Sequence, residues 1–404
     1  MRYSPLRMQV GQARINQARW AVAALFFTNG ALYANVAPRF PEIKTALGLS
    51  DAVYGLSIAA FAAGALIAGL GAGALNQRWG APLVATVSTA LSGLALLFVG
   101  IASVPWAFAG GLFLAGAMDA ITDVAQNDHG LRVQDAAGRS ILNSFHATWS
   151  IGAVSGGAMA GAAIALGLPL HLHLTLSFLV FTGIAIIAKH FCLPPALIAA
   201  AKQPTDEPAT RIGGLSAPRI ALLIAISAIT VGSTVVEDLG SSWASLYLHE
   251  SLGLPGSIAA FGLVAVAGAQ FVGRLLGDRM TDRLGPVLMA RIGGGLVALG
   301  LGSALLLPSA PLTFLGFMAA GFGIATLVPS AFHAADQIPG LTPGTGLTIV
   351  AWLMRVTFLL TPPVVGAIAD TTSLRLALGL IPIIGVLTVL IAPVFSPSQG
   401  QNLS

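Results

Sequence analysis

Twelve apolar segments, each close to 20 residues long or longer, run through this chain and are separated by short polar stretches. About 20 apolar residues make a helix that crosses a bilayer, whereas roughly a quarter of the residues in soluble domains are charged. Here only 8% of the 404 residues are charged and 56% are hydrophobic. The sequence therefore predicts an all-α integral membrane protein. The predicted spans are about 20–37, 52–75, 81–102, 104–127, 141–167, 170–192, 219–248, 255–276, 287–307, 310–335, 343–369 and 373–395.

A hydrophilic stretch between the sixth and seventh spans divides the chain into halves. It starts with Lys202-Gln203-Pro204 and continues to Arg219. We expect an N-terminal six-helix bundle over residues 1–200, a cytoplasmic linker over 201–218 and a C-terminal six-helix bundle over 219–404. The first segment follows several arginines, as in a signal peptide. At roughly 18 residues it is long enough to span, so we interpret it as the first transmembrane helix.

The basic residues predict the orientation of these helices. If the N-terminus is cytoplasmic, only Arg39, Lys44 and Arg375 of the 19 Lys and Arg residues fall outside, and Arg355 lies within a span. This distribution follows the positive-inside rule, which explains the net charge of +4 better than a nucleic-acid partner does. We expect a monomer in the bacterial inner membrane with both termini cytoplasmic, the lipid bilayer around it, and no nucleic-acid partner.

One short loop pattern occurs in both halves. Gly73-Ala74-Leu75-Asn76-Gln77-Arg78-Trp79-Gly80 follows the second span, and Gly277-Asp278-Arg279-Met280-Thr281-Asp282-Arg283-Leu284-Gly285 follows the eighth. The same order of glycine, acid or amide, arginine and glycine returns six helices later, as a duplicated six-helix unit predicts. A generic basic loop explains the arginines but leaves the repeated glycines unexplained.

With these loops the whole chain resembles a major facilitator superfamily transporter. The resemblance implies two pseudo-symmetric six-helix bundles that alternate access, with the loop acting as a cytoplasmic gate. Asn76 stands where an acid is usual, so we expect a weaker, less charge-dependent contact in the first half. The gate residues that match are Asn76, Arg78, Gly80, Asp278, Arg279, Asp282, Arg283 and Gly285.

Further motifs carry a narrower resemblance. They are Asp123-Val124-Ala125-Gln126-Asn127, Gly138-Arg139, Ser144-Phe145-His146, Trp243-Ala244-Ser245-Leu246-Tyr247-Leu248, Pro339-Gly340 with Pro343-Gly344, and Thr361-Pro362-Pro363-Val364-Val365-Gly366. Together they are similar to a bacterial branch near the fucose-permease-like sugar transporters, which includes a membrane protein associated with rhizopine (inosamine) transport. Asp119 and Arg355 depart from the pattern of that branch and count against a plain neutral sugar as the substrate.

An acidic stripe interrupts the fourth apolar segment. Asp119, Asp123 and Asn127 recur at i, i+4 and i+8 and share one face of a helix. Ionisable groups inside a membrane are costly and are functional by default, so we expect proton coupling or substrate binding at Asp119. Asp123 is a further candidate for proton coupling. It lies nearer the cytoplasmic mouth, where an ion pair with a purely structural role is an equal alternative.

The second half has its own charged residues. Glu237, with Asp238 as its alternate, is a candidate for proton coupling and substrate binding, and a helix break is expected at Gly240-Ser241-Ser242. Trp243 offers a ring face for a ligand or serves as an interfacial anchor. Arg355 either pairs with an acid such as Asp119 or Glu237, or binds an anionic group of the substrate.

Four more polar residues complete the candidate binding set, and polar contacts between helices are the competing interpretation of each. Asn29 and Tyr33 share one face of the first span at i, i+4. His146 lies near the start of the fifth span and Gln270 lies in the eighth. A single histidine in an apolar helix is more often an interhelical hydrogen-bond donor than a proton relay.

The chain carries no nucleotide-binding loop, metal-ligand spacing or nucleophile motif, so we expect neither an enzyme nor a cofactor. We therefore predict a secondary transporter, a proton symporter of a small polar sugar, polyol or amino-cyclitol. The alternative within the same fold is proton-driven efflux of drugs or cationic amphipathic compounds, although aromatic residues make up only 7% of the chain. A receptor-like membrane protein that moves nothing would not need buried charges in both halves.

Overall fold

The computed structural model describes residues 11–138, 141–194, 217–338, 341 and 345–396. Within these residues the regular structure is helical and contains no strand. Eleven helical stretches are long and apolar enough to cross a membrane, and α7 (Leu142–Ala165) adds a helix of 24 residues. The predicted all-α membrane architecture is confirmed.

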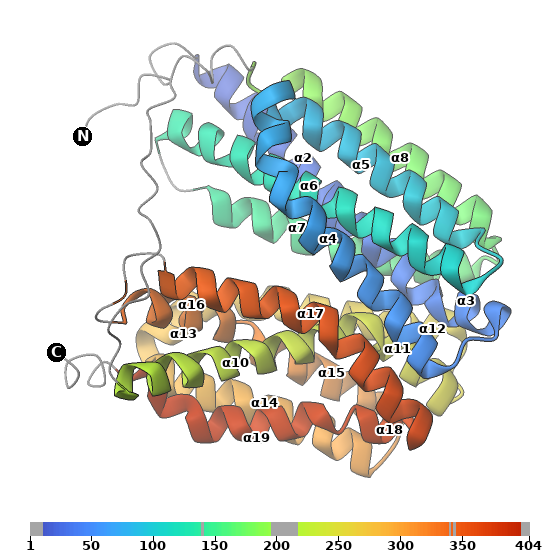
Figure 1. The fold of residues 1–404 in the computed structure, drawn as a ribbon, viewed down its shortest axis with the longest axis vertical. Helices are drawn as coiled ribbons and strands as arrows, with labels where there is room; N and C mark the ends of the chain where they lie inside the picture. Colours follow the sequence, from blue (N-terminus) through green and yellow to red (C-terminus); the bar gives the residue numbers. More distant parts are fainter. Residues whose placement is uncertain (1–10, 139–140, 195–216, 339–340, 342–344, 397–404) are drawn as a thin grey trace. The chain divides into compact units, whose positions relative to one another are not determined.

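Two compact units make up the fold (Figure 1). The first contains residues 1–49 and 56–205, and the second contains residues 50–55 and 206–404. Most of the predicted linker, over residues 201–216, lies outside the described residues. The helices of the first unit are α2 (Gln12–Val36), η1 (Ala37–Arg39), α3 (Phe40–Leu47), α4 (Asp51–Trp79) from residue 56 onward, α5 (Ala81–Gly100), α6 (Pro105–Ala137), α7 and α8 (Leu170–Phe191).

The second unit has more short helical pieces. Its helices are α10 (Ala217–Ser242), α11 (Ala244–Leu246), the π-helix η2 (Tyr247–Ser251), α12 (Gly256–Ala259), α13 (Phe261–Leu284), α14 (Pro286–Leu306), α15 (Ala310–Ile324), α16 (Leu327–Asp336), α17 (Thr345–Thr371), α18 (Leu374–Ala377), α19 (Leu380–Ile391) and η3 (Ala392–Phe395). The predicted span 310–335 is divided between α15 and α16, and the predicted span 219–248 is interrupted at Trp243.

The first turn of α4 belongs to the second unit. Asp370 of α17 accepts hydrogen bonds from the backbone N–H groups of Asp51 (2.7 Å) and Ala52 (3.0 Å). A carboxylate at this position satisfies two of the free N–H groups at a helix N-terminus and opposes the positive end of the helix dipole. Glycines at 55 and 366 bring the backbones of α4 and α17 into direct contact there.

Glycines set the spacing of the helices in the first unit. A Cβ atom added to Gly30 of α2 would collide with the Trp149 carbonyl oxygen of α7, and one added to Gly152 of α7 would collide with that of Phe27. Gly64 of α4 and Gly116 of α6 show the same reciprocal relation, with the carbonyl oxygens of Phe113 and Phe61. Small residues at helix interfaces allow backbones to approach closely in lipid, as these pairs do.

Alanine at one of these contacts should destabilise the first unit. In Gly116→Ala, the new methyl group meets backbone that cannot rotate away, and we expect a loss of about 1–3 kcal/mol. Gly110→Ala is the matched control, because a Cβ atom at Gly110 of the same helix meets nothing within 4 Å. Thermal unfolding in detergent measures the difference. Equal melting temperatures for the two variants would contradict the close α4–α6 contact.

Candidate functional site

One amide group joins three helices of the first unit. Asn29 of α2 donates from Nδ2 to Oδ1 of Asp119 in α6 at 2.7 Å. The Asn29 Oδ1 atom accepts from Trp149 Nε1 of α7 at 2.9 Å and from Gln126 Nε2 of α6 at 3.3 Å. The structure therefore brings two predicted residues, Asn29 and Asp119, into one hydrogen-bonded group with two residues that we did not predict.

Asp123 continues this group along α6. Its Oδ1 atom accepts from Gln126 Nε2 at 3.3 Å and from Asn127 Nδ2 at 2.9 Å, and its side chain is exposed. Gln126 thus connects Asp123 to Asn29, while the carboxylate of Asp119 lies one turn away on the same helix. Arg139 of the Gly138-Arg139 motif lies outside the described residues.

Two other candidates of the first unit, His146 and Tyr33, make aromatic contacts. His146 of α7 is exposed, and its ring centroid lies 5.2 Å from that of Phe26. Tyr33 of α2 is half-buried, with its ring 4.7 Å from Phe61 and 5.9 Å from Phe40.

The sequence carried a signal for both residues that we missed. Gln126 stands inside the Asp123–Asn127 motif, and Trp149 is the tryptophan of the fifth apolar segment, three residues after His146. Residues three apart on a helix are neighbours on its surface.

The second unit holds an ion pair between α10 and α13. Arg274 Nη2 lies 3.7 Å from Glu237 Oε1, and both side chains are partly exposed. Arg274 lies within α13, near the end of the predicted span 255–276. Gln270 is buried one turn earlier on the same helix. Arg355 of α17 is exposed and has no ion-pair partner among the described residues of the second unit.

The helix break after Ser242 is occupied by protein groups. The carbonyl oxygen of Ser242 accepts from the hydroxyl of Tyr54 at 2.8 Å. Trp243 is fully buried, and its ring packs edge-on against Tyr54 with centroids 5.0 Å apart. Asp238 is buried, and its Oδ2 atom has no hydrogen-bond partner among the described residues. The structure thus places Trp243 in the core and leaves Glu237 as the more accessible of the two adjacent acids.

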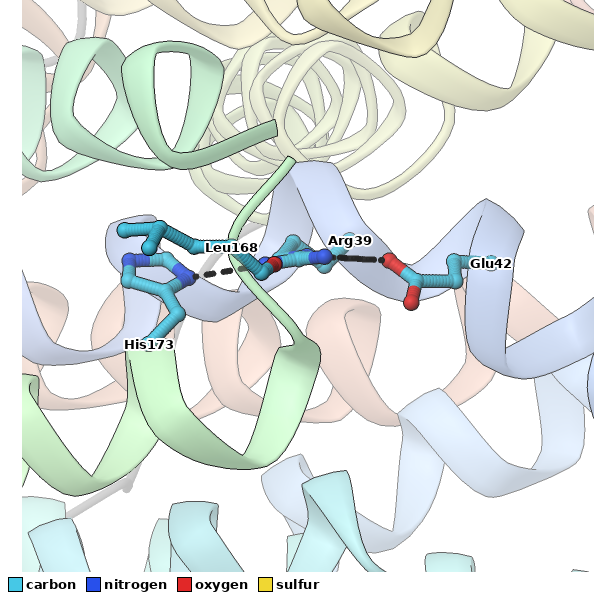
Figure 2. A network of polar contacts seen from close by, with 4 residues as sticks. All are labelled: Arg39, Glu42, Leu168 and His173. Carbon is cyan, nitrogen blue, oxygen red and sulfur yellow. Dashed lines mark hydrogen bonds and ion pairs between the residues drawn. The ribbon is translucent and has the colours of Figure 1, made fainter. Parts of the chain in front are cut away.

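A second polar network of the first unit surrounds Arg39 (Figure 2). The Arg39 side chain donates to Glu42 Oε2 at 2.8 and 2.9 Å and to the Leu168 carbonyl at 3.0 Å. Its Nη1 atom also lies 3.4 Å from His173 Nδ1. Because a guanidinium only donates, this arrangement assigns the ring hydrogen to Nε2, which donates to Asn35 Oδ1 at 2.7 Å. Arg39 is buried, so these hydrogen bonds replace the water that would otherwise surround its charge.

These arrangements have limited chemical possibilities. The Asn29 group offers a carboxylate, amides and an indole, which bind protons and hydroxyl or amino groups. The Glu237–Arg274 pair offers one group of each charge. Among the described residues, no three His, Cys, Asp or Glu side chains are grouped so that they could hold a metal ion.

Comparison with known proteins decides the family. Residues 22–340 match the Major Facilitator Superfamily. The chain belongs to this superfamily. It is accordingly a multi-pass membrane transporter rather than an enzyme, and the resemblance inferred from the duplicated loops is confirmed.

Relatives within the superfamily match over nearly the whole chain. The "Membrane protein MosC" of Rhizobium meliloti is 30% identical over 367 residues, which are 91% of this chain and 87% of that protein. The "Uncharacterized transporter y4wD" of Sinorhizobium fredii is 28% identical over 373 residues, which are 92% of this chain and 97% of that protein.

Among solved structures, the nucleoside transporter NupG aligns with a TM-score of 0.71 at 15% identity, covering 94% of this chain and 98% of that one. A bacterial homolog of the human lysosomal transporter Spinster aligns with a TM-score of 0.72 at 14% identity, covering 96% and 100%. These structures show that the fold is shared.

The superfamily loop has the same backbone in both units. Gly80 and Gly285 have φ angles of 83° and 78°, and each N–H bonds the carbonyl of the residue four positions earlier. Asn76 is buried, Arg78 stacks over the Trp79 ring at 5.4 Å, and Arg279, Asp282 and Arg283 are exposed. The backbone of Asp278 lies within α13. The repeated glycines thus have a conformational reason, because side-chain-bearing residues rarely adopt this backbone.

Gly285→Ala should therefore destabilise the second unit by about 1–3 kcal/mol, since alanine is strained at a φ of 78°. Gly295→Ala in the following helix is the control. A Cβ atom there meets nothing, and alanine favours a helix by up to about 1 kcal/mol. Thermal melting of both variants tests the prediction, which fails if Gly285→Ala melts no lower than Gly295→Ala.

The Glu237–Arg274 pair predicts an order of stabilities. Glu237→Gln or Arg274→Gln alone leaves one charge uncompensated in a membrane helix, whereas the double variant removes both charges. We expect each single variant to melt below the double variant. The coupling energy should be about 1 kcal/mol or less, since both side chains are partly exposed. Strictly additive effects in a double-mutant cycle would show that the two charges do not interact.

Proposed function

We propose that this transporter is coupled to protons and moves a small polar solute, such as a sugar, polyol or amino-cyclitol, across the bacterial inner membrane. The observation that carries the proposal is the setting of Asp119. Its hydrogen-bond partner is the neutral amide of Asn29, and no Lys or Arg among the described residues of the first unit pairs with it. Because its partner is neutral, Asp119 can bind a proton and lose its charge without leaving an unpaired positive charge.

Polar groups beside Asp119 support a solute with hydroxyl or amino groups. The ring of Trp149 is half-buried, and the exposed Asp123 adds a second carboxylate. An aromatic face with nearby carboxylates binds the apolar face of a sugar-like ring or a cationic amino group. The similarity to the branch associated with rhizopine transport points to an amino-cyclitol within this class. Both termini on the cytoplasmic side and alternating access between two six-helix bundles belong to the same proposal.

Asp119→Asn tests the coupling. The asparagine keeps the shape and removes the ionisable group, so we expect proton-driven accumulation in proteoliposomes to fall to the level of protein-free liposomes. Solute counterflow, which needs no net proton movement, should persist. Asp135→Asn is the matched control, because Asp135 is an exposed residue near the end of the same helix, and it should accumulate solute like the unmodified protein.

A thermal-shift screen identifies the class of solute that binds. It compares the stabilisation of the protein by sugars, polyols and amino-cyclitols with that by organic anions and by cationic drugs. Stabilisation by the drugs alone would replace the proposed solute class with drug efflux. Undiminished accumulation by Asp119→Asn would reject coupling at this residue.

A further inference from the structure

The side chain of Asn29 is fixed in one orientation by its neighbours. Its N–H end faces the carboxylate of Asp119, and its oxygen faces two donors, Trp149 Nε1 and Gln126 Nε2. Only 6% of the residue is exposed, so water has little access to replace any of these contacts. Rotating the amide by half a turn would set donors against donors at Trp149 and Gln126.

We propose that Asn29 is a positioning residue that transmits the protonation of Asp119 to the indole of Trp149. The inference rests on the proposed function, because it assumes that Asp119 takes up a proton from the surrounding water and later returns it. Without the proton, Asp119 accepts a charge-assisted hydrogen bond, and Asn29 keeps its oxygen available to the indole.

Proton binding changes the hydrogen bonds that Asp119 can make with Asn29. A proton on Oδ1 turns this atom into a donor, and it then competes with Trp149 for the single oxygen of Asn29. A proton on Oδ2 leaves the existing hydrogen bond but removes its charge assistance, which about halves its strength. In the first case Asn29 loses its hold on the indole directly; in the second its amide is held less firmly by Asp119, so the orientation that serves the indole is less strongly fixed.

Gln126 provides an alternative partner when Asn29 rotates. It is fully buried, and its Oε1 atom has no hydrogen-bond partner among the described residues. Such an unsatisfied acceptor is costly, and a rotated Asn29 presents N–H groups on that side. If the Gln126 amide turns together with that of Asn29, its Oε1 atom accepts from Asn29, and no donor faces a donor between these two residues.

Close backbone packing confines the response to side chains. A Cβ atom added to Gly30, next to Asn29, would collide with the carbonyl oxygen of Trp149, so the backbones of α2 and α7 lie close together at this point. The indole nitrogen is the one polar atom of the Trp149 side chain, and its ring is half-buried. Losing the bond to Asn29 thus frees the ring to reorient where a solute would contact it.

Other titratable groups near Asp119 must be separated from it experimentally. They are Asp123 on α6, Tyr33 on α2 and His146 on α7. The neighbouring α5 has no charged residue, and α4 has none between Leu56 and Leu75. Asp123→Asn and His146→Gln variants therefore serve as controls.

The test follows the indole N–H signals of the full-length, ¹⁵N-tryptophan-labelled protein in detergent by NMR as the pH is lowered. Trp149→Phe assigns the relevant signal among those of the six tryptophans. We expect this signal to move with pH toward the position of a weaker hydrogen bond. The movement should vanish in Asp119→Asn and in Asn29→Ala and persist in Asp135→Asn, Asp123→Asn and His146→Gln.

Each outcome separates the inference from the proposed function. A pH-independent Trp149 signal, together with lost accumulation in Asp119→Asn, overturns the role of Asn29 and leaves proton coupling in place. A pH-dependent movement of the Trp149 signal that persists in Asp119→Asn also overturns the role of Asn29, because a group other than Asp119 would then cause the movement. If Asp119→Asn still accumulates solute and the signal does not move, both proposals fail. Should Asn29→Ala not fold, the comparison of Asp119→Asn with Asp135→Asn decides alone.

Discussion

A carboxylate inside a membrane helix is the constraint around which the first unit is arranged. Asp119 must be hydrogen-bonded, because an unsatisfied charge in hydrocarbon costs several kcal/mol. The protein supplies the amide of Asn29, and that amide is itself satisfied at its other end by Trp149 and Gln126. A neutral partner leaves Asp119 free to change charge, which an arginine in the same place would oppose.

This arrangement depends on how closely the helices approach. Asparagine has a short side chain, so its amide reaches groups on both α6 and α7 only where α2 lies against α7. Gly30 and Gly152 allow that approach, since a methyl group at either position would collide with the facing backbone. The polar network therefore depends on these glycines, because larger residues at their positions would push α2 and α7 apart and separate the hydrogen-bonded groups.

The sequence predicted the helices and the duplicated loops because both depend on local pattern, namely apolar length and glycine order. It also predicted Asn29 and Asp119 as separate polar residues in apolar helices. It could not predict that they meet, or that Trp149 and Gln126 join them, because the register between helices is set by three-dimensional packing. Nor could it predict that Arg274 pairs with Glu237, because the two residues lie on different helices and no local pattern identifies the partner.

The two units treat their intramembrane acids in different ways. The second unit gives Glu237 a cation, so the charge there is already balanced, and protonating Glu237 would leave Arg274 alone. The first unit gives Asp119 an amide, so protonation creates no unpaired charge. The proposed proton coupling is therefore better served by Asp119 than by Glu237. This difference also explains why the residues that respond to a proton should be sought around Asp119, where Asn29, Trp149 and Gln126 are all neutral.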